Sequence, residues 1–451
     1  MIGRQLSRWT LAWFASGLAG LVLALGLAAA GAGGPGGWTT GAGLAVLHLF
    51  VLGWLSQVML GALIQFMPVL CARPLCWPGL SLPALVLTGV GMVMLAGGLA
   101  ALDGWTTGQG LLALAPLVLL GAFGLAGAML VPTLLAAGAV RGAEGRMVAL
   151  ALAALAGLWA TGAAMAGALS GYGWPPVVVA DALPLHALLG IGGWLTLAAF
   201  GVSYKLFAMF LLAPEGDNPL RRAVFATAAL GLAAALAFAA LALSGAGPVA
   251  PAPVALAGIA AIALHLAEIR RLWRSRRRPQ VEATMQWSRA ALAFLALSAA
   301  LLVPAALWGG PWAEAAGFAA LAGWLSTLTL AQMVRIVSFL TWIQIFAPQI
   351  GRRPVPLVAD LSDARAAGRW LALWVAGTAA GTLALGLGHG PGFRLAALAM
   401  LAAALGLGAE AVAIRRLRHL DPARRPPTLP PLVRPVSLQG APHDHTRTPR
   451  A

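Results

Sequence analysis

The sequence predicts an all-α polytopic membrane protein of about twelve transmembrane helices, arranged as three four-helix arcs around a pseudo-threefold axis. The first observation is composition: 60% of the residues are hydrophobic and 9% are charged, whereas a soluble domain has roughly 25% charged residues. The second is a series of apolar stretches long enough to cross a hydrocarbon core of about 30 Å. The third is a short motif that recurs in three of these stretches.

Twelve apolar segments justify the individual helices in order along the chain. They cover residues 10–32, 41–70, 81–101, 110–138, 147–169, 181–212, 222–245, 251–272, 289–309, 313–346, 370–388 and 393–416. We therefore expect one membrane domain over residues 1–417. The first segment is longer than the apolar core of a secretion signal, so we expect it to be retained. Residues 418–451 are rich in Pro and Arg and lack apolar periodicity, which favours a disordered cytoplasmic tail.

The formal net charge of +16 comes from arginines that gather on one side of the expected membrane. The connections that follow the even-numbered segments are basic, whereas the opposite connections together hold one basic residue, Arg394. Tryptophans occupy those opposite connections, as in an interfacial aromatic belt: Trp38, Trp105, Trp174, Trp308 and Trp312. This pattern predicts cytoplasmic termini and a location in the inner membrane of a bacterium. The bilayer is the expected partner, and no nucleic-acid partner is expected.

A Gly-Trp-Leu motif recurs in the second, sixth and tenth segments, which are also the longest. Its tryptophans are Trp54, Trp194 and Trp324. Eleven residues after each tryptophan stands a polar or charged side chain: Gln65, Lys205 and Arg335. Long side chains at that depth reach the inner headgroups, or they anchor an anion such as a haem propionate. The repeat predicts that these three helices line the interior of the bundle.

Two histidines, His48 and His186, precede the motif at the expected outer ends of the second and sixth segments. Neutral imidazole is a strong ligand for haem iron, copper and zinc, and an ionisable group in a bilayer is a candidate functional residue by default. The alternative is a helix-end histidine that hydrogen-bonds to a neighbouring helix or to interfacial water. We therefore treat both residues as candidate cofactor and metal ligands.

The two histidines do not have matching positions relative to the motif. His48 precedes its tryptophan by six residues and His186 by eight, and two residues turn an α-helix by about 200°. Without a local bulge, the two rings are expected to face different directions. A third histidine, His265, stands three residues before Glu268, and a local His–Glu hydrogen bond is expected there.

The second segment resembles the second helix of subunit I of the haem–copper oxidases. The resemblance rests on Leu47-His48-Leu49-Phe50-Val51-Leu52-Gly53-Trp54, continuing to Gly61 and Met67-Pro68, together with twelve spans in three arcs. It implies that His48 is a ligand of a low-spin haem and that His186 lies in the helix that donates a copper ligand. Haem- and copper-binding membrane proteins of the NnrS type are a near alternative.

The chain departs from the oxidase pattern in the segments that complete its metal centres. The seventh and tenth segments, 222–244 and 313–346, contain no histidine, where the oxidases have a His-His pair and two further histidines. A complete binuclear oxygen-reducing centre is therefore not expected, and copper is not expected. What the resemblance leaves is one b-type haem on His48, with His186 or a non-histidine group as the second ligand.

Three functions remain open on the sequence alone. The first is a redox or gas-handling protein with one b-type haem, working with a redox or respiratory-chain partner. The second is a non-catalytic membrane protein that acts in complex assembly or in a response to nitric oxide or respiratory stress. The third is a small-molecule transporter, although the sequence lacks the paired broken helices that mark many transporter sites.

Overall fold

The computed structural model describes residues 9–104, 108–243, 252–277, 281–352 and 354–433. Within these ranges the secondary structure is helical and contains no strand. Nine long helices form a first set: α1 (Thr10–Ala30), α4 (Ser81–Ala100), α5 (Gln109–Ala136), α6 (Ala143–Leu169), α9 (Pro219–Leu243), α10 (Ala252–Arg274), α11 (Ala283–Trp308), α14 (Ala364–Gly386) and α15 (Gly390–Arg415).

Three longer helices each consist of two α-helical parts joined by a π-helical segment. The parts are α2 (Gly41–His48) with α3 (Gln57–Cys71), α7 (Val177–Ala187) with α8 (Leu197–Leu211), and α12 (Gly310–Phe318) with α13 (Thr327–Ile345). The π-helical segments are Leu49–Ser56, Leu188–Thr196 and Ala319–Ser326. These are the second, sixth and tenth segments of the sequence, and each π-helical segment contains one Gly-Trp-Leu motif.

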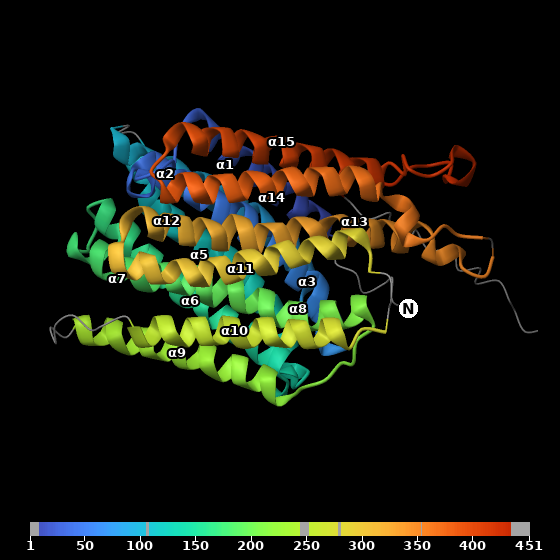
Figure 1. Ribbon diagram of the computed structural model, residues 1–451, viewed down its shortest axis with the longest axis horizontal. Coiled ribbons are helices and arrows are strands. Elements are labelled where there is room, and N and C mark those ends of the chain that lie inside the picture. The colour runs from blue at the N-terminus through green and yellow to red at the C-terminus, as the bar shows by residue number, and fades with distance from the viewer. Residues whose placement is uncertain (1–8, 105–107, 244–251, 278–280, 353, 434–451) are drawn as a thin grey trace, which may run out of the picture.

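The long helices make the chain a polytopic membrane protein. Eleven helices in the described residues are long and apolar enough to cross a bilayer. The twelfth, α14, has 23 residues and carries Arg365 and Arg369 near its start, which lowers its hydropathy. The helices run along a common direction, and the first and last of the described residues lie at the same end of the bundle (Figure 1). We call this the termini end.

The helices form three equivalent four-helix arcs, which confirms the predicted architecture. In each arc the third and fourth helices pair: α4 with α5, α9 with α10, and α14 with α15. The first helix of each arc packs against the long central helix: α1 on α3, α6 on α8, and α11 on α13. Contacts of α5 with α6, α10 with α11, and α15 with α1 close the ring.

The motif glycines allow each central helix to approach its neighbours closely. A Cβ on Gly193 would collide with the Cβ of Ala154 on α6, and one on Gly323 would collide with the ring of Phe294 on α11. In both arcs the glycine therefore faces the first helix of its own arc. Small residues at such contacts drive helix association in a bilayer, where helix burial gains little hydrophobic energy.

The motif tryptophans meet at the centre of the bundle, and all three are fully buried. Trp54 Nε1 donates to Ser326 Oγ at 3.0 Å, and Trp194 Nε1 donates to Ser56 Oγ at 3.0 Å. Each bond joins one arc to another. The two serine hydroxyls in turn donate to carbonyls five residues earlier, as the π-helical geometry permits.

The first part of the expected tail makes contacts with the bundle. Arg415, at the end of α15, donates to the carbonyls of Pro431 and Leu432 and to Thr341 Oγ1 on α13. Residues 420–433 are therefore held at the termini end. The remainder of the expected tail, 434–451, lies outside the described residues, as does Trp105 of the expected aromatic belt.

Candidate functional site

His48 and His186 lie side by side near the end of the bundle opposite the termini. Their ring centroids are 6.4 Å apart, with an angle of 36° between the ring planes. His48 is the last residue of α2, and His186 is the penultimate residue of α7. Both side chains are half-buried.

The expectation that the two rings face different directions held only without a local bulge, and both helices contain one. It applied the 100° step of an α-helix to offsets of six and eight residues. The chain between each histidine and its tryptophan is π-helical instead, over Leu49–Ser56 and Leu188–Thr196. Such segments are rare and occur frequently at functional sites. The condition attached to the expectation is therefore not met, and the two rings lie side by side.

A backbone hydrogen bond fixes the tautomer of His48. Its Nδ1 lies 2.8 Å from the carbonyl oxygen of Leu44, one turn earlier in α2. A carbonyl oxygen only accepts, so Nδ1 carries the proton and donates it. In the neutral ring, Nε2 therefore presents a lone pair. Metal-binding histidines are oriented in this way by a second hydrogen bond.

His186 is held in the same tautomer by a side chain of α6. Its Nδ1 lies 3.1 Å from Thr161 Oγ1. The Thr161 hydroxyl has one proton, which it donates to the carbonyls of Gly157 and Leu158 at 3.0 and 3.1 Å. With the proton assigned to these carbonyls, the oxygen accepts from His186 Nδ1 and the lone pair lies on Nε2. Gly162 permits this approach, since a Cβ there would lie 2.9 Å from His186 Cε1.

The pair therefore offers two imidazole lone pairs at one place. A metal–imidazole bond is about 2.0–2.1 Å long, so two rings on opposite sides of one ion have centres roughly 6 Å apart. The observed 6.4 Å agrees with that separation. No group of three or more His, Cys, Asp or Glu side chains in the described ranges could hold a metal. Any further ligand from the described residues would therefore belong to another residue type or to the backbone.

The polar residues eleven positions after the motif tryptophans lie far from the histidines and have partners of their own. Gln65 pairs with Thr10, Lys205 with Glu215, and Arg335 with Glu282. The guanidinium carbon of Arg335 also lies 3.7 Å from the centroid of the Phe210 ring. The structure therefore does not bring them to the candidate site, and the carboxylate partners of Lys205 and Arg335 favour a structural role for these two residues.

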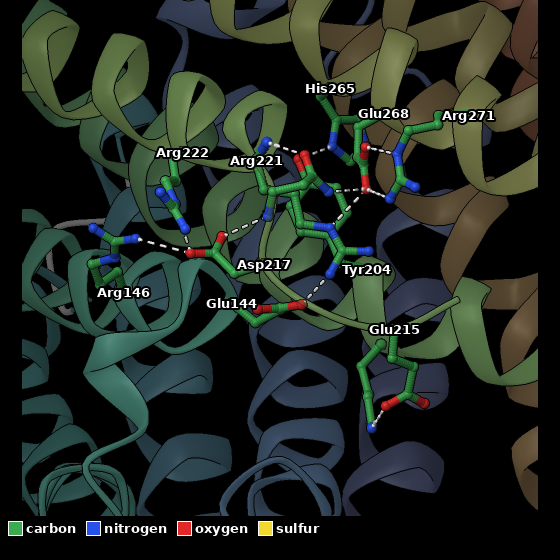
Figure 2. Close-up of polar contacts among 12 residues, drawn as sticks. Glu144, Arg146, Tyr204, Glu215, Asp217, Arg221, Arg222, His265, Glu268 and Arg271 are labelled. Carbon is green, nitrogen blue, oxygen red and sulfur yellow. Dashed lines mark hydrogen bonds and ion pairs between the residues drawn. The ribbon is translucent and has the colours of Figure 1, made fainter. Parts of the chain in front are cut away.

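The expected hydrogen bond between His265 and Glu268 does not form. His265 Nδ1 lies 3.0 Å from Tyr204 Oη, whereas both carboxylate oxygens of Glu268 accept from arginines (Figure 2). The helical spacing was compatible with a local contact, but side chains from α8 and α9 compete for both partners.

A buried ion-pair cluster at the termini end was not predicted from the sequence. Arg221 of α9 is 1% exposed and donates from Nε to Glu268 Oε1 at 2.7 Å. Its Nη1 pairs with Glu144 of α6, and Arg271 pairs with Glu268 at 2.7 Å (Figure 2). One available signal was an acidic residue, Glu268, within an otherwise apolar segment. Because buried charges require partners, the cluster holds α6, α9 and α10 together at the termini end of the bundle.

Two apolar cavities lie elsewhere in the bundle. One lies between α1, α2, α12 and α15 and is lined by Val46, Phe50, Phe318 and Phe393 among others. The second lies among the three central helices, on the side of the tryptophans nearer the termini, where Gln332 is one of few polar lining residues. Neither cavity is lined by His48 or His186.

The fold defines the chain as an all-α integral membrane protein with a paired-histidine site. No protein-family model matches the sequence, and no curated protein matches it.

Proposed function

We propose that the protein is a membrane-embedded redox protein in which His48 and His186 together bind one b-type haem. The observation that carries the proposal is the common tautomer of the two rings. Each Nδ1 is engaged by a protein acceptor, Leu44 O or Thr161 Oγ1. Each Nε2 is thereby prepared as a ligand for the same centre.

The ligand count favours haem over a bare ion. A structural or catalytic zinc ion normally takes three or four protein ligands, and the described residues offer two imidazoles and no adjoining acidic or thiol group. A haem brings four ring nitrogens of its own and needs only axial ligands from the protein. His48 and His186 would hold the group, which would supply one-electron transfer when bound.

The protein's own contribution is to hold the imidazoles in place. The carbonyl of Leu44 and the hydroxyl of Thr161 orient the two rings and place the lone pair of each on Nε2. The resembling oxidases use the histidines of the second and sixth helices in different centres. We assign both to one centre in this chain, and a redox or respiratory-stress role in a bacterial inner membrane follows from that assignment.

Purified protein tests the assignment through its reduced-minus-oxidised spectrum and its metal content. We expect a Soret band and a sharp b-type band in the wild type, and their loss in His48→Ala and in His186→Ala. His389→Asn is a matched control, because His389 lies at the same end of the bundle and its Nδ1 accepts from Gly392 N. Wild-type protein without a Soret band would refute haem binding. Metal bound without that band would indicate a bare ion at the pair.

The proposed orientation, with both termini cytoplasmic, is supported by the arginines that gather at the termini end. Topology reporters test it independently of the cofactor. A reporter fused after Arg146 should be active in the cytoplasm, and one fused beside Trp174 should be active outside. A cytoplasmic signal at Trp174 would contradict the orientation.

A further inference from the structure

Two buried ring nitrogens near the centre of the bundle have no hydrogen-bond partner among the described residues: Trp324 Nε1 and His265 Nε2. Both side chains are fully buried, and their ring centroids are 5.9 Å apart. A buried polar group without a partner is costly, because it has lost its hydrogen bond to water. Two such atoms on neighbouring rings indicate a partner that they share.

The indole nitrogen is not satisfied by the face of an aromatic ring. Phe200 and His265 stack face to face, with centroids 3.6 Å apart and planes 6° from parallel. Trp324 lies 6.1 Å from the first ring and 5.9 Å from the second. Because these two distances are nearly equal, Trp324 lies beside the stack and not over either outer face. Its N–H therefore has no π acceptor in this stack.

Tyr204 decides which protonation state His265 presents. Tyr204 is fully buried, and its hydroxyl lies 3.0 Å from His265 Nδ1 (Figure 2). That hydroxyl has no second hydrogen-bond partner in the part of the chain that the structure describes, so its proton is donated to Nδ1. The proton of the neutral imidazole then resides on Nε2. Both unpaired nitrogens are thus N–H donors, and both require an acceptor.

The position of these donors coincides with a gap in the threefold pattern. Trp54 of the first arc donates to the third arc, and Trp194 of the second arc donates to the first. By the same rotation, Trp324 of the third arc should donate to Thr196 of the second arc. Among the described residues it does not. His265, which also belongs to the second arc, lies beside it instead.

We propose that one water molecule binds between Trp324 and His265 and that its oxygen accepts both N–H bonds. It joins the third arc to the second, as direct Trp–Ser bonds join the other two pairs of arcs. An anion is disfavoured because both donors are neutral and an isolated charge at this depth is costly. Buried waters satisfy such groups in many proteins. This site is distinct from the histidine pair and does not depend on a metal there.

Ultraviolet resonance Raman spectroscopy tests the site, because the indole bands report whether the N–H is hydrogen-bonded. The wild-type minus Trp324→Phe difference spectrum isolates this one tryptophan. We expect the band position of a hydrogen-bonded indole. His265→Phe keeps Trp324 but removes the second donor, so the water is held less firmly. In this variant we expect the indole band to shift toward the position of a free indole. Trp54→Phe is the matched control, since that indole bonds directly to Ser326.

Three outcomes would overturn the proposal. One is a free-indole band for Trp324 in the wild type, and another is a bonded band that does not change in His265→Phe. The third concerns the identity of the ligand. In H₂¹⁸O, the infrared spectrum of the wild type should contain an isotope-shifted O–H stretch of the bound water, and Trp324→Phe should lack it. If no isotope shift is seen in the wild type, the acceptor is not water. If a variant does not fold, a density map of the wild type that resolves ordered water should show a peak between the two nitrogens.

Discussion

The indole of Trp194 donates a hydrogen bond to the hydroxyl of Ser56, 138 residues earlier in the chain. This bond connects the second arc to the first. Its counterpart between Trp54 and Ser326 connects the first arc to the third. The repeated motif therefore joins the first arc to the second and to the third, and the hydroxyl residues after the leucine, Ser56 and Ser326, are the acceptors.

Replacing Ser56 by Ala should destabilise the bundle by about 1–3 kcal/mol, because the buried N–H of Trp194 loses its acceptor. Thr196→Ala is the matched control at the equivalent position of the second arc, where no tryptophan donates among the described residues. Thermal unfolding in detergent measures both. Equal losses for the two variants would argue against a role of the Trp–Ser bond in joining the arcs.

Gly323→Ala should destabilise the protein by roughly 1–3 kcal/mol, because the added Cβ would collide with Phe294 and force the two helices apart. Gly127→Ala in α5 provides the comparison, since nothing lies within 4 Å of the position of its Cβ. That substitution should be neutral or slightly stabilising, because alanine is the better helix former. A stable Gly323→Ala variant would show that the close contact is not required.

Glu268→Gln should be strongly destabilising, by about 3–5 kcal/mol, because it removes the fully buried one of the two carboxylates that neutralise Arg221. Glu215→Gln breaks an exposed ion pair, in which the side chain of Lys205 is 27% exposed and that of Glu215 is 49% exposed. Its effect on stability should therefore be below about 1 kcal/mol. Denaturation curves of the two variants give the difference directly. A small effect at Glu268 would mean that Glu144 alone neutralises Arg221.

Asp363 caps α14 and should make a small acid-sensitive contribution to stability. The backbone N–H groups of Ala366 and Arg365 donate to its carboxylate and hold its pKa below the ordinary value. A lowered folded-state pKa stabilises the fold above the unfolded value, about 3.9, and this contribution is lost as the pH falls through the folded value. Asp363→Ala should therefore lower the melting temperature at pH 7, because it removes an N-cap worth about 1 kcal/mol. In acid, the difference in melting temperature between the variant and the wild type should disappear. A gap that does not depend on pH would exclude the carboxylate as its origin.

The sequence by itself determined the class of protein, the number of spans and the three central helices. Apolar length and the Gly-Trp-Leu repeat are local properties, and a bilayer imposes them segment by segment. The sequence also singled out His48 and His186, because imidazoles near apolar helix ends stand out against such a composition.

Only the tertiary structure decided which side chains meet. His48 and His186 come from different arcs, and the packing of α2 and α7 brings their rings side by side. Arg221 and Glu268, like Trp324 and His265, come from different helices, and the packing of the arcs determines their proximity. In the bilayer each helix satisfies its own backbone hydrogen bonds. Pairing between helices is therefore set by side-chain shape and by the few polar groups that must find partners, and both depend on how the whole bundle packs.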